Sequence, residues 1–204
     1  MSIQYDGSLM AKTRTGTYIG KRNEQGTIVF RGIPYGKYVG RWQELEPLTD
    51  SDEISAAYTN GPICPQVKYL NWYPKAVDEI ADETSCCHLA VATSSIKGKK
   101  PVYVFIHGGA NITGGYFDKR YDPQFFVNRN PDVVFVVFNY RIGILGTLYL
   151  GDLTDDPAYR YSGNITSRDQ LAAFKWIQEN IAAFGGDPDN ITIGGRSSGS
   201  VSTT

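Results

Sequence analysis

The chain has 204 residues, of which 41% are hydrophobic and 20% are charged, and its formal net charge is −1. This composition is typical of a soluble globular protein, of one domain or part of a larger one, and the charge gives no reason to expect nucleic acid or an anionic membrane as a partner. No apolar run is long enough to cross a bilayer, and the first residues lack the apolar core of a secretory signal, so we expect a cytoplasmic protein.

The first half of the sequence contains few strong structural signals. Residues 18–30 alternate around Asn23-Glu24-Gln25-Gly26, which predicts a β-hairpin with a glycine-containing turn. From Arg31 to about Lys100 the sequence is rich in Gly, Pro and Tyr and has weak periodicity. We expect long irregular connections with short elements there, which inside a compact domain usually form a functional surface.

Three short apolar runs in the second half predict strands. They span Val102–Ile106, Val133–Phe138 and, less strongly, Asp189–Gly195. Continuous rather than alternating apolar residues are typical of central strands covered on both faces, as in parallel sheets. The runs therefore predict the core of an α/β fold.

The clearest helix is predicted between the second and third runs. Ser167 and Gln170 have the spacing of a capping box, which places the helix start at Ser167. The apolar face is predicted to contain Leu171, Phe174, Ile177 and Ile181, widened by Ala172 and Trp176. Gly185-Gly186, followed by Pro188, is expected to end the helix.

The cysteines give no pattern of a metal site. Cys64 is isolated, Cys86 and Cys87 are adjacent, and no Cys-x-x-Cys pair accompanies a histidine cluster. We therefore expect neither a metal nor a cofactor. A Cys64–Cys86 disulfide is conceivable, but a reducing cytoplasm would keep both residues as small buried thiols, and the sequence leaves the pairing open.

A short motif near the C-terminus indicates a nucleophilic serine. Gly195-Arg196-Ser197-Ser198-Gly199 fits the G-x-S-x-G pattern, in which a strand-to-helix turn exposes the central serine. The glycines two positions on either side relieve crowding in that turn, and residues 191–193 supply the preceding strand. The alternative is a disordered tail rich in Ser and Gly.

A second motif supplies the complementary half of a hydrolase site. His107-Gly108-Gly109-Ala110 follows the first apolar run and resembles the HGGG-type turn, whose backbone N–H groups stabilise an oxyanion. Two glycines allow the backbone to approach a substrate closely. A simple connecting turn is the alternative.

Several segments, in order along the chain, resemble the type B carboxylesterases, the cholinesterase-like family of α/β-hydrolases. They are FRGIPYG from Phe30, CPQ from Cys64, VFIHGG from Val104, NYRIGILG from Asn139, the GN pair at Gly163, and DQLAAFKWIQENIAAFGGDPDNITIGGRSSG from Asp169. The resemblance implies an α/β-hydrolase fold, here truncated, with a mostly parallel or mixed central sheet, an N-terminal β-hairpin and flanking helices. It implies Ser197 as nucleophile and the N–H groups of Gly109, Ala110 and Ser198 as the oxyanion hole. It also implies that Asn139-Tyr140-Arg141 is structural and that Cys64 and Cys86 match positions often bridged in secreted relatives.

The chain departs from this family pattern at several positions. Ala110 replaces the third glycine of the oxyanion turn, and Asn111 follows it where an aromatic residue is common. Arg196 replaces an often acidic residue before the serine; a cation there would oppose the imidazolium that forms during catalysis. The family's glutamate partner for the arginine matched by Arg41 is missing from its expected position.

The sequence does not supply a catalytic base for Ser197. In this family the acid and the histidine follow the serine in the chain, whereas the two histidines here, His88 and His107, precede it. We interpret both as scaffold residues. We therefore expect residues 1–204 to be the N-terminal portion of a single α/β-hydrolase domain, cut shortly after the serine turn and inactive alone.

These observations predict a carboxylic-ester hydrolase that acts on small-molecule esters through a serine acyl-enzyme. A complementing C-terminal chain, or self-association through an exposed sheet edge, is the expected macromolecular interaction. The alternatives are a non-catalytic, protein-binding member of the same fold and an inactive truncated product. The sequence does not specify the acyl or alcohol group of the substrate.

Overall fold

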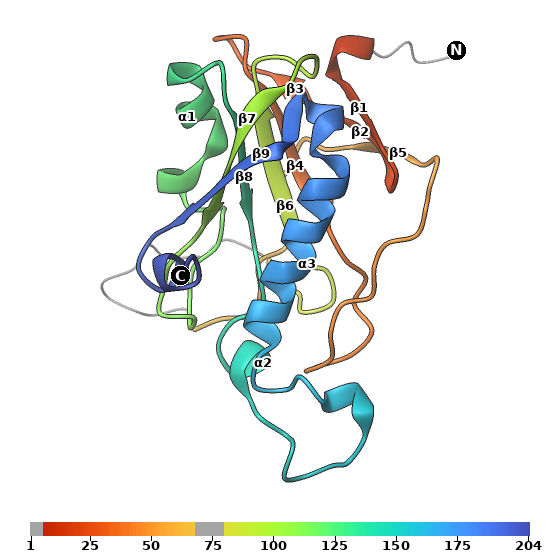
Figure 1. The fold of residues 1–204 in the computed structure, drawn as a ribbon, viewed down its shortest axis with the longest axis vertical. Helices are drawn as coiled ribbons and strands as arrows, with labels where there is room; N and C mark the ends of the chain where they lie inside the picture. The colour runs from red at the N-terminus through yellow and green to blue at the C-terminus, as the bar shows by residue number, and fades with distance from the viewer. Residues whose placement is uncertain (1–5, 68–79) are drawn as a thin grey trace.

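The computed structural model describes residues 6–67 and 80–204, which form two sheets with helices packed around the larger one (Figure 1). The large sheet contains, in spatial order, β3 (Lys21–Arg22), β4 (Ile28–Pro34), β6 (His88–Thr93), β8 (Val134–Phe138), β7 (Lys100–Ile106) and β9 (Gly186–Gly195). The small sheet contains β1 (Met10–Thr13), β2 (Gly16–Ile19) and β5 (Ile54–Ala56). The α-helices are α1 (Pro123–Arg129), α2 (Ile144–Thr147), α3 (Ile165–Asn180) and α4 (Ser198–Val201). Among the described residues, no helix is both long and apolar enough to span a bilayer.

The three apolar runs form adjacent parallel strands, as predicted. β7 lies between β8 and β9 and pairs in parallel with both, so that Val104 lies opposite Val136 on one side and Ile193 on the other. β9 begins at Gly186, three residues before the predicted start. The sheet is mixed, because β3, β4, β6 and β8 pair with one another in antiparallel order.

The large sheet is covered by different helices on its two faces. In β8, Val134, Val136 and Phe138 belong to the buried cluster that includes the apolar residues of α3. Phe135 and Val137 belong to a second cluster with Val127 of α1. Because successive side chains of a strand point to opposite faces, α1 and α3 cover opposite sides of the sheet (Figure 1).

The predicted hairpin is present but shorter than expected, and one central strand was missed. β3 and β4 pair across the Asn23–Thr27 turn, in which Gly26 has a φ of 88°. Tyr18 and Ile19 instead pair with β1 and β5 in the small sheet. β6 lies inside the segment predicted to be irregular, and all six of its residues are buried between β4 and β8.

The start and the buried face of α3 differ from the prediction. The helix begins at Ile165 after Asn164, so Ser167 lies within its first turn and the predicted capping box is wrong. Ile165 is fully buried, and Thr166 donates a side-chain hydrogen bond of 2.8 Å to the carbonyl of Arg141, which together fix the earlier start. Leu171 is 46% exposed, because the residues facing the core are Ala173, Trp176 and Ile177. The predicted stop is confirmed: Gly185, with a φ of 79°, follows a 3-10 turn at Ile181–Phe184.

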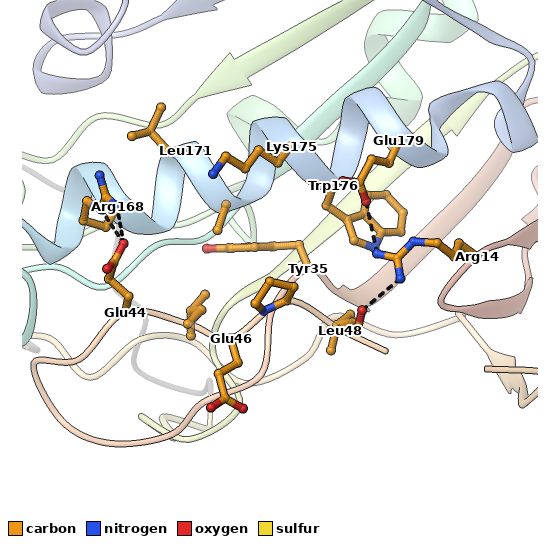
Figure 2. A pocket seen from close by; sticks show the side chains of 13 residues that line it. Arg14, Tyr35, Glu44, Glu46, Leu48, Arg168, Leu171, Lys175, Trp176 and Glu179 are labelled. Atoms are coloured by element: carbon orange, nitrogen blue, oxygen red, sulfur yellow. Dashed lines mark hydrogen bonds and ion pairs between the residues drawn. The ribbon is translucent and has the colours of Figure 1, made fainter. Parts of the chain in front are cut away.

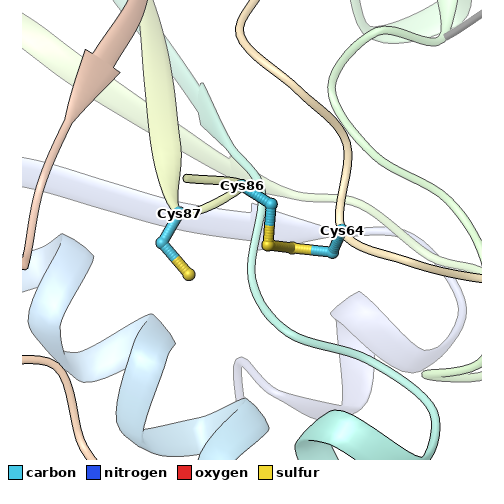
Figure 3. Close-up of side chains that lie close together, drawn as sticks. All are labelled: Cys64, Cys86 and Cys87. Atoms are coloured by element: carbon cyan, nitrogen blue, oxygen red, sulfur yellow. A yellow bond between two sulfur atoms is a disulfide. The ribbon is translucent and has the colours of Figure 1, made fainter. Parts of the chain in front are cut away.

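Cys64 and Cys86 form a disulfide, a pairing that the sequence leaves open (Figure 3). Their Cα atoms are 4.8 Å apart although the residues are separated by 22 positions in sequence. The Ile63 amide donates to the carbonyl of Ile80 (2.8 Å), and the Asp82 amide donates to the carbonyl of Ile63 (3.1 Å). These bonds hold the segment that contains Cys64 beside the segment that leads to Cys86. Cys87 is a free, buried thiol.

The arginine whose glutamate partner was judged missing has an acidic partner. Arg41 donates from Nε and Nη2 to both carboxylate oxygens of Glu83, at distances of 2.6 to 3.0 Å. The expectation that Arg41 lacks an acidic partner is therefore wrong, because Glu83 supplies one.

Candidate active site

Ser197 lies in a sharp turn between β9 and α4. Its backbone has φ 55° and ψ −122°, a region that costs a residue with a side chain about 1–3 kcal/mol. Hydrogen bonds hold the turn: the Arg196 amide donates to the carbonyl of Ile106 (3.2 Å), and the Gly199 amide donates to that of Arg196 (2.9 Å). This is the strained, strand-to-helix geometry that the G-x-S-x-G motif predicts.

The two flanking glycines of the motif are required by space. A Cβ atom at Gly195 would lie 2.4 Å from the carbonyl of Gly199. A Cβ atom at Gly199 would lie 2.2 Å from the carbonyl oxygen of Ile106 at the end of β7. Both distances are far below van der Waals contact, so α4 can approach β7 and β9 only because neither residue has a side chain.

The turn after β7 also has an unusual backbone. Gly109 has a φ of 128°, and Ala110 and Asn111 have φ values of 56° and 55°. The amides of Ile112 and Thr113 both donate to the carbonyl of Gly109, at 3.0 and 3.1 Å, and close the turn. The Ala110 side chain is exposed, so its methyl group is accommodated outside the packed part of the turn.

The two turns are in contact. Ile106 and Gly195, the last residues of β7 and β9, are paired in the sheet, so the segments that follow them leave the same edge side by side. A Cβ atom at Gly108 would lie 2.5 Å from the carbonyl oxygen of Arg196 and 3.0 Å from Cβ of Ser197. The glycine turn therefore packs directly against the serine turn.

Within the described part of the chain, the backbone amides of Gly109, Ala110 and Ser198 in these two turns make no hydrogen bond. Most backbone N–H groups near a protein interior are paired, so these three donors remain available to a ligand.

The buried side chain of His107 packs beneath the backbone of the glycine turn, between Tyr140 and the carbonyl of Gly108. Its buried ring stacks on Tyr140 with a centroid separation of 4.3 Å, and its Nδ1 lies 3.0 Å from the carbonyl oxygen of Gly108. Tyr140 in turn donates its hydroxyl to the carbonyl of His107 at 2.7 Å. Burial lowers the pKa of His107 to about 4, so the ring is neutral at pH 7.

His88 is likewise a core residue. It starts β6, is 3% exposed, and its Nε2 lies 2.7 Å from the carbonyl oxygen of Pro62. Burial lowers its pKa to about 4. Among the described residues, no hydrogen bond joins either histidine ring to Ser197, in agreement with the scaffold role predicted for both.

The Asn139-Tyr140-Arg141 segment is anchored by a buried ion pair. Arg141 and Asp169 are both 0% exposed, and Arg141 donates to the Asp169 carboxylate from Nε (2.8 Å), Nη2 (2.6 Å) and its backbone amide (3.0 Å). Although burial opposes the charged form, hydrogen bonds to Asp169 raise the pKa of Arg141 overall. Asp169 was recognised only as part of a family segment, because its partner lies 28 positions away and the contact has no local signal.

Arg196 precedes Ser197, at a position where the family that the sequence resembles often has an acidic residue. Its Nη1 donates to the hydroxyl of Tyr121 at 3.1 Å, which directs the guanidinium toward the segment before α1. Among the described residues it forms no ion pair with a carboxylate. A positive charge therefore lies on the residue next to Ser197.

A separate cavity of about 140 Å³ lies along α3 (Figure 2). Its walls are the outer face of α3 and the segment 44–48. The arginines at its two ends are paired, Arg168 with Glu44 and Arg14 with Glu179. Neither Ser197 nor the glycine turn lines this cavity, so it is distinct from the candidate site.

Comparison with known proteins identifies the family of the chain. The model of the Carboxylesterase family matches residues 7–204. The juvenile hormone esterase of Heliothis virescens is 37% identical over 179 residues, which are 83% of this chain and 30% of that protein. The para-nitrobenzyl esterase of Bacillus subtilis is 37% identical over 184 residues, which are 88% of this chain and 36% of that protein.

Solved structures share the fold of this chain. The carboxylesterase Est55 of Geobacillus stearothermophilus superposes with a TM-score of 0.84 at 40% identity, over 95% of this chain and 39% of that one. A thermophilic para-nitrobenzyl esterase superposes with a TM-score of 0.85 at 35% identity, over 96% of this chain and 40% of that one. The chain thus spans well under half the length of these relatives. It has the α/β-hydrolase fold and belongs to the carboxylesterase family.

Proposed function

We propose that Ser197 is the nucleophile of a carboxylic-ester hydrolase and that the amides of Gly109, Ala110 and Ser198 form its oxyanion hole. The observation that carries this proposal is the direct packing of the glycine turn on the strained serine turn, with Gly108 against Ser197. Strained backbone is maintained where the surrounding structure over-determines it, and such positions cluster at functional sites.

In the proposed reaction the Ser197 hydroxyl oxygen attacks the ester carbonyl carbon and loses its proton to a base. The carbonyl oxygen becomes an oxyanion that accepts hydrogen bonds from the three amides; loss of one such donor typically costs about 2.7–4 kcal/mol of transition-state stabilisation. The alcohol leaves, and water then hydrolyses the acyl-serine to release the carboxylic acid. Small-molecule esters are the proposed substrate class.

The base and acid of this reaction are proposed to lie outside residues 1–204. His88 and His107, the two histidines in the sequence, are both buried in the scaffold. A serine without its base loses on the order of a million-fold in turnover. Residues 1–204 are accordingly proposed to be the N-terminal portion of one α/β-hydrolase domain and to lack useful esterase activity alone.

A chimera tests this proposal. Residues 1–204 are fused to the complementary C-terminal part of the Bacillus subtilis para-nitrobenzyl esterase, a relative at 37% identity. The expected result is hydrolysis of p-nitrophenyl acetate that disappears in Ser197→Ala, whereas the same ester shows no Ser197-dependent turnover with residues 1–204 alone. A folded chimera that has no activity, or whose activity is unchanged by Ser197→Ala, would refute the catalytic role and favour a non-catalytic, protein-binding role.

Two further properties belong to the proposal. β9 pairs only with β7 among the described residues, and Ile193 on it is 42% exposed, so this edge is proposed to pair with a complementing segment or a second copy.

The compartment is proposed from redox chemistry. The sequence favours the cytoplasm, whereas the Cys64–Cys86 disulfide is expected to persist in an oxidising environment. Thiol titration of protein isolated from its native source under alkylating conditions separates the two.

A further inference from the structure

Three cysteine sulfur atoms lie close together at the start of β6. The sulfurs of Cys64, Cys86 and Cys87 all lie within 4.8 Å of one another (Figure 3). Their residues are 2%, 0% and 7% exposed. Among the residues that the structure describes, these three cysteines are the set of potential ligand side chains whose sulfur atoms lie close enough together to hold one ion. The spacing of the cysteines in the sequence does not reveal this cluster, because Cys64 approaches Cys86 and Cys87 only through the hydrogen bonds of Ile63 with Ile80 and Asp82.

Reduction converts this cluster from a disulfide and a thiol into three thiols. A dithiol reductant supplies two electrons and two protons to the Cys64–Cys86 bond and is itself oxidised to a cyclic disulfide. Cys87 is already a thiol, and its sulfur lies 3.5 Å from Oδ2 of Asp169, to which it donates. Reduction without a change of fold would leave three thiols in one buried place.

The net charge of the complex determines which thiophilic ion can be bound by three buried thiolates. The nearest ionic groups are Asp169 and Arg141, which already neutralise each other. Three thiolates around a monovalent or divalent metal ion would leave a net negative charge, and burying an uncompensated charge is costly. A trivalent centre with three thiolates is neutral.

We propose that the reduced protein binds trivalent arsenic, taken up as arsenite, through the sulfurs of Cys64, Cys86 and Cys87. Arsenous acid condenses with neutral thiols: three As–O bonds break, three As–S bonds form, and each thiol proton leaves with a hydroxide as water. Arsenic stays trivalent, so binding needs no oxidant or reductant beyond the dithiol that opens the disulfide. The proposal does not depend on the proposed esterase function.

The experiment compares arsenite with phenylarsine oxide, whose arsenic has only two exchangeable positions and so requires only two thiols. The 204-residue protein is reduced, freed of reductant without air and titrated with each compound; bound arsenic is measured by mass spectrometry and free thiols with a chromogenic disulfide. In the wild type, arsenite is expected to block all three thiols. In Cys87→Ser the affinity for arsenite is expected to fall by more than about 100-fold, because loss of a partner that does not bind the centre directly already costs about 10- to 100-fold. The affinity for phenylarsine oxide is expected to be unchanged. The oxidised protein, in which the disulfide removes two ligands, is expected to bind neither compound.

Each remaining outcome overturns the proposal. Equal arsenite affinity of the wild type and Cys87→Ser would exclude the third sulfur as a ligand. Failure of the reduced wild type to bind either compound would show that the cluster is inaccessible. Circular dichroism of the reduced protein completes the test, since loss of the native spectrum on reduction would mean that no assembled three-thiol site exists.

Discussion

Replacing Gly109 with alanine is expected to destabilise the protein strongly, although only one methyl group is added. The φ of Gly109 is 128°, and the new Cβ atom would lie 1.9 Å from the carbonyl oxygen of Thr113. That oxygen cannot move freely, because the Thr113 amide is hydrogen-bonded to Gly109 itself at 3.1 Å. Backbone strain of about 1–3 kcal/mol and overpacking of about 1–3 kcal/mol together give an expected loss of about 2–6 kcal/mol.

Ala110→Gly is the matched control in the same turn. Ala110 has a φ of 56° and an exposed side chain, so removal of its methyl group relieves left-handed backbone strain of about 1–2 kcal/mol. The added glycine flexibility costs about 0.5–1 kcal/mol. The variant is therefore expected to be more stable than the wild type by about 0–1.5 kcal/mol.

Equilibrium unfolding in urea, followed by tryptophan fluorescence and circular dichroism, measures both variants. A typical domain is stable by about 5–15 kcal/mol, so the expected loss for Gly109→Ala is a large shift of the midpoint. If Gly109→Ala unfolded at the same urea concentration as the wild type, the backbone of the turn would differ from the one described, and its amides would not be positioned as an oxyanion hole.

Three further predictions concern the scaffold around the site. Asp169→Asn leaves the buried Arg141 charge without its partner, and the free energy of unfolding is expected to fall by about 3–5 kcal/mol in urea titrations; a loss below about 1 kcal/mol would contradict the structural role of the pair. His88 and His107 have folded-state pKa values near 4, below the unfolded value near 6.5, so the unfolded state takes up more protons as the pH falls. Stability is expected to be constant above about pH 7 and to fall by about 2 kcal/mol per histidine between pH 7.5 and pH 5, and a urea midpoint that is flat over this range would refute the neutral, buried state of the rings. Ile193→Lys places a charge on the exposed edge of β9 and is expected to reduce self-association in light scattering without lowering the unfolding midpoint; unchanged association would move the contact surface away from this edge.

The parts of the fold that the sequence predicts are those with local signals. Continuous apolar residues identify β7, β8 and β9 because burial on both faces of a central strand requires them. The glycines around Ser197 and Gly109 identify the two turns because no other residue fits those backbones. The sequence order of the strands and turns, read together with the family resemblance, indicates that both turns lie at one sheet edge.

The parts that the sequence does not predict depend on distant partners. β6 has the ordinary sequence HLAVAT, and it becomes a central strand because β4 and β8 pair with it on either side. The start of α3 is fixed by Thr166 bonding to Arg141, which outweighs the local capping signal at Ser167. The Arg41–Glu83 ion pair likewise depends on chain positions that only folding brings together.

A crystal structure of the chimera described above, after reaction with a fluorophosphonate, tests the proposed site most directly. We expect a phosphorus–oxygen bond to Ser197, with the phosphoryl oxygen about 2.7–3.1 Å from the amide nitrogens of Gly109, Ala110 and Ser198. An adduct on another residue, or a phosphoryl oxygen directed into solvent away from these amides, would contradict it.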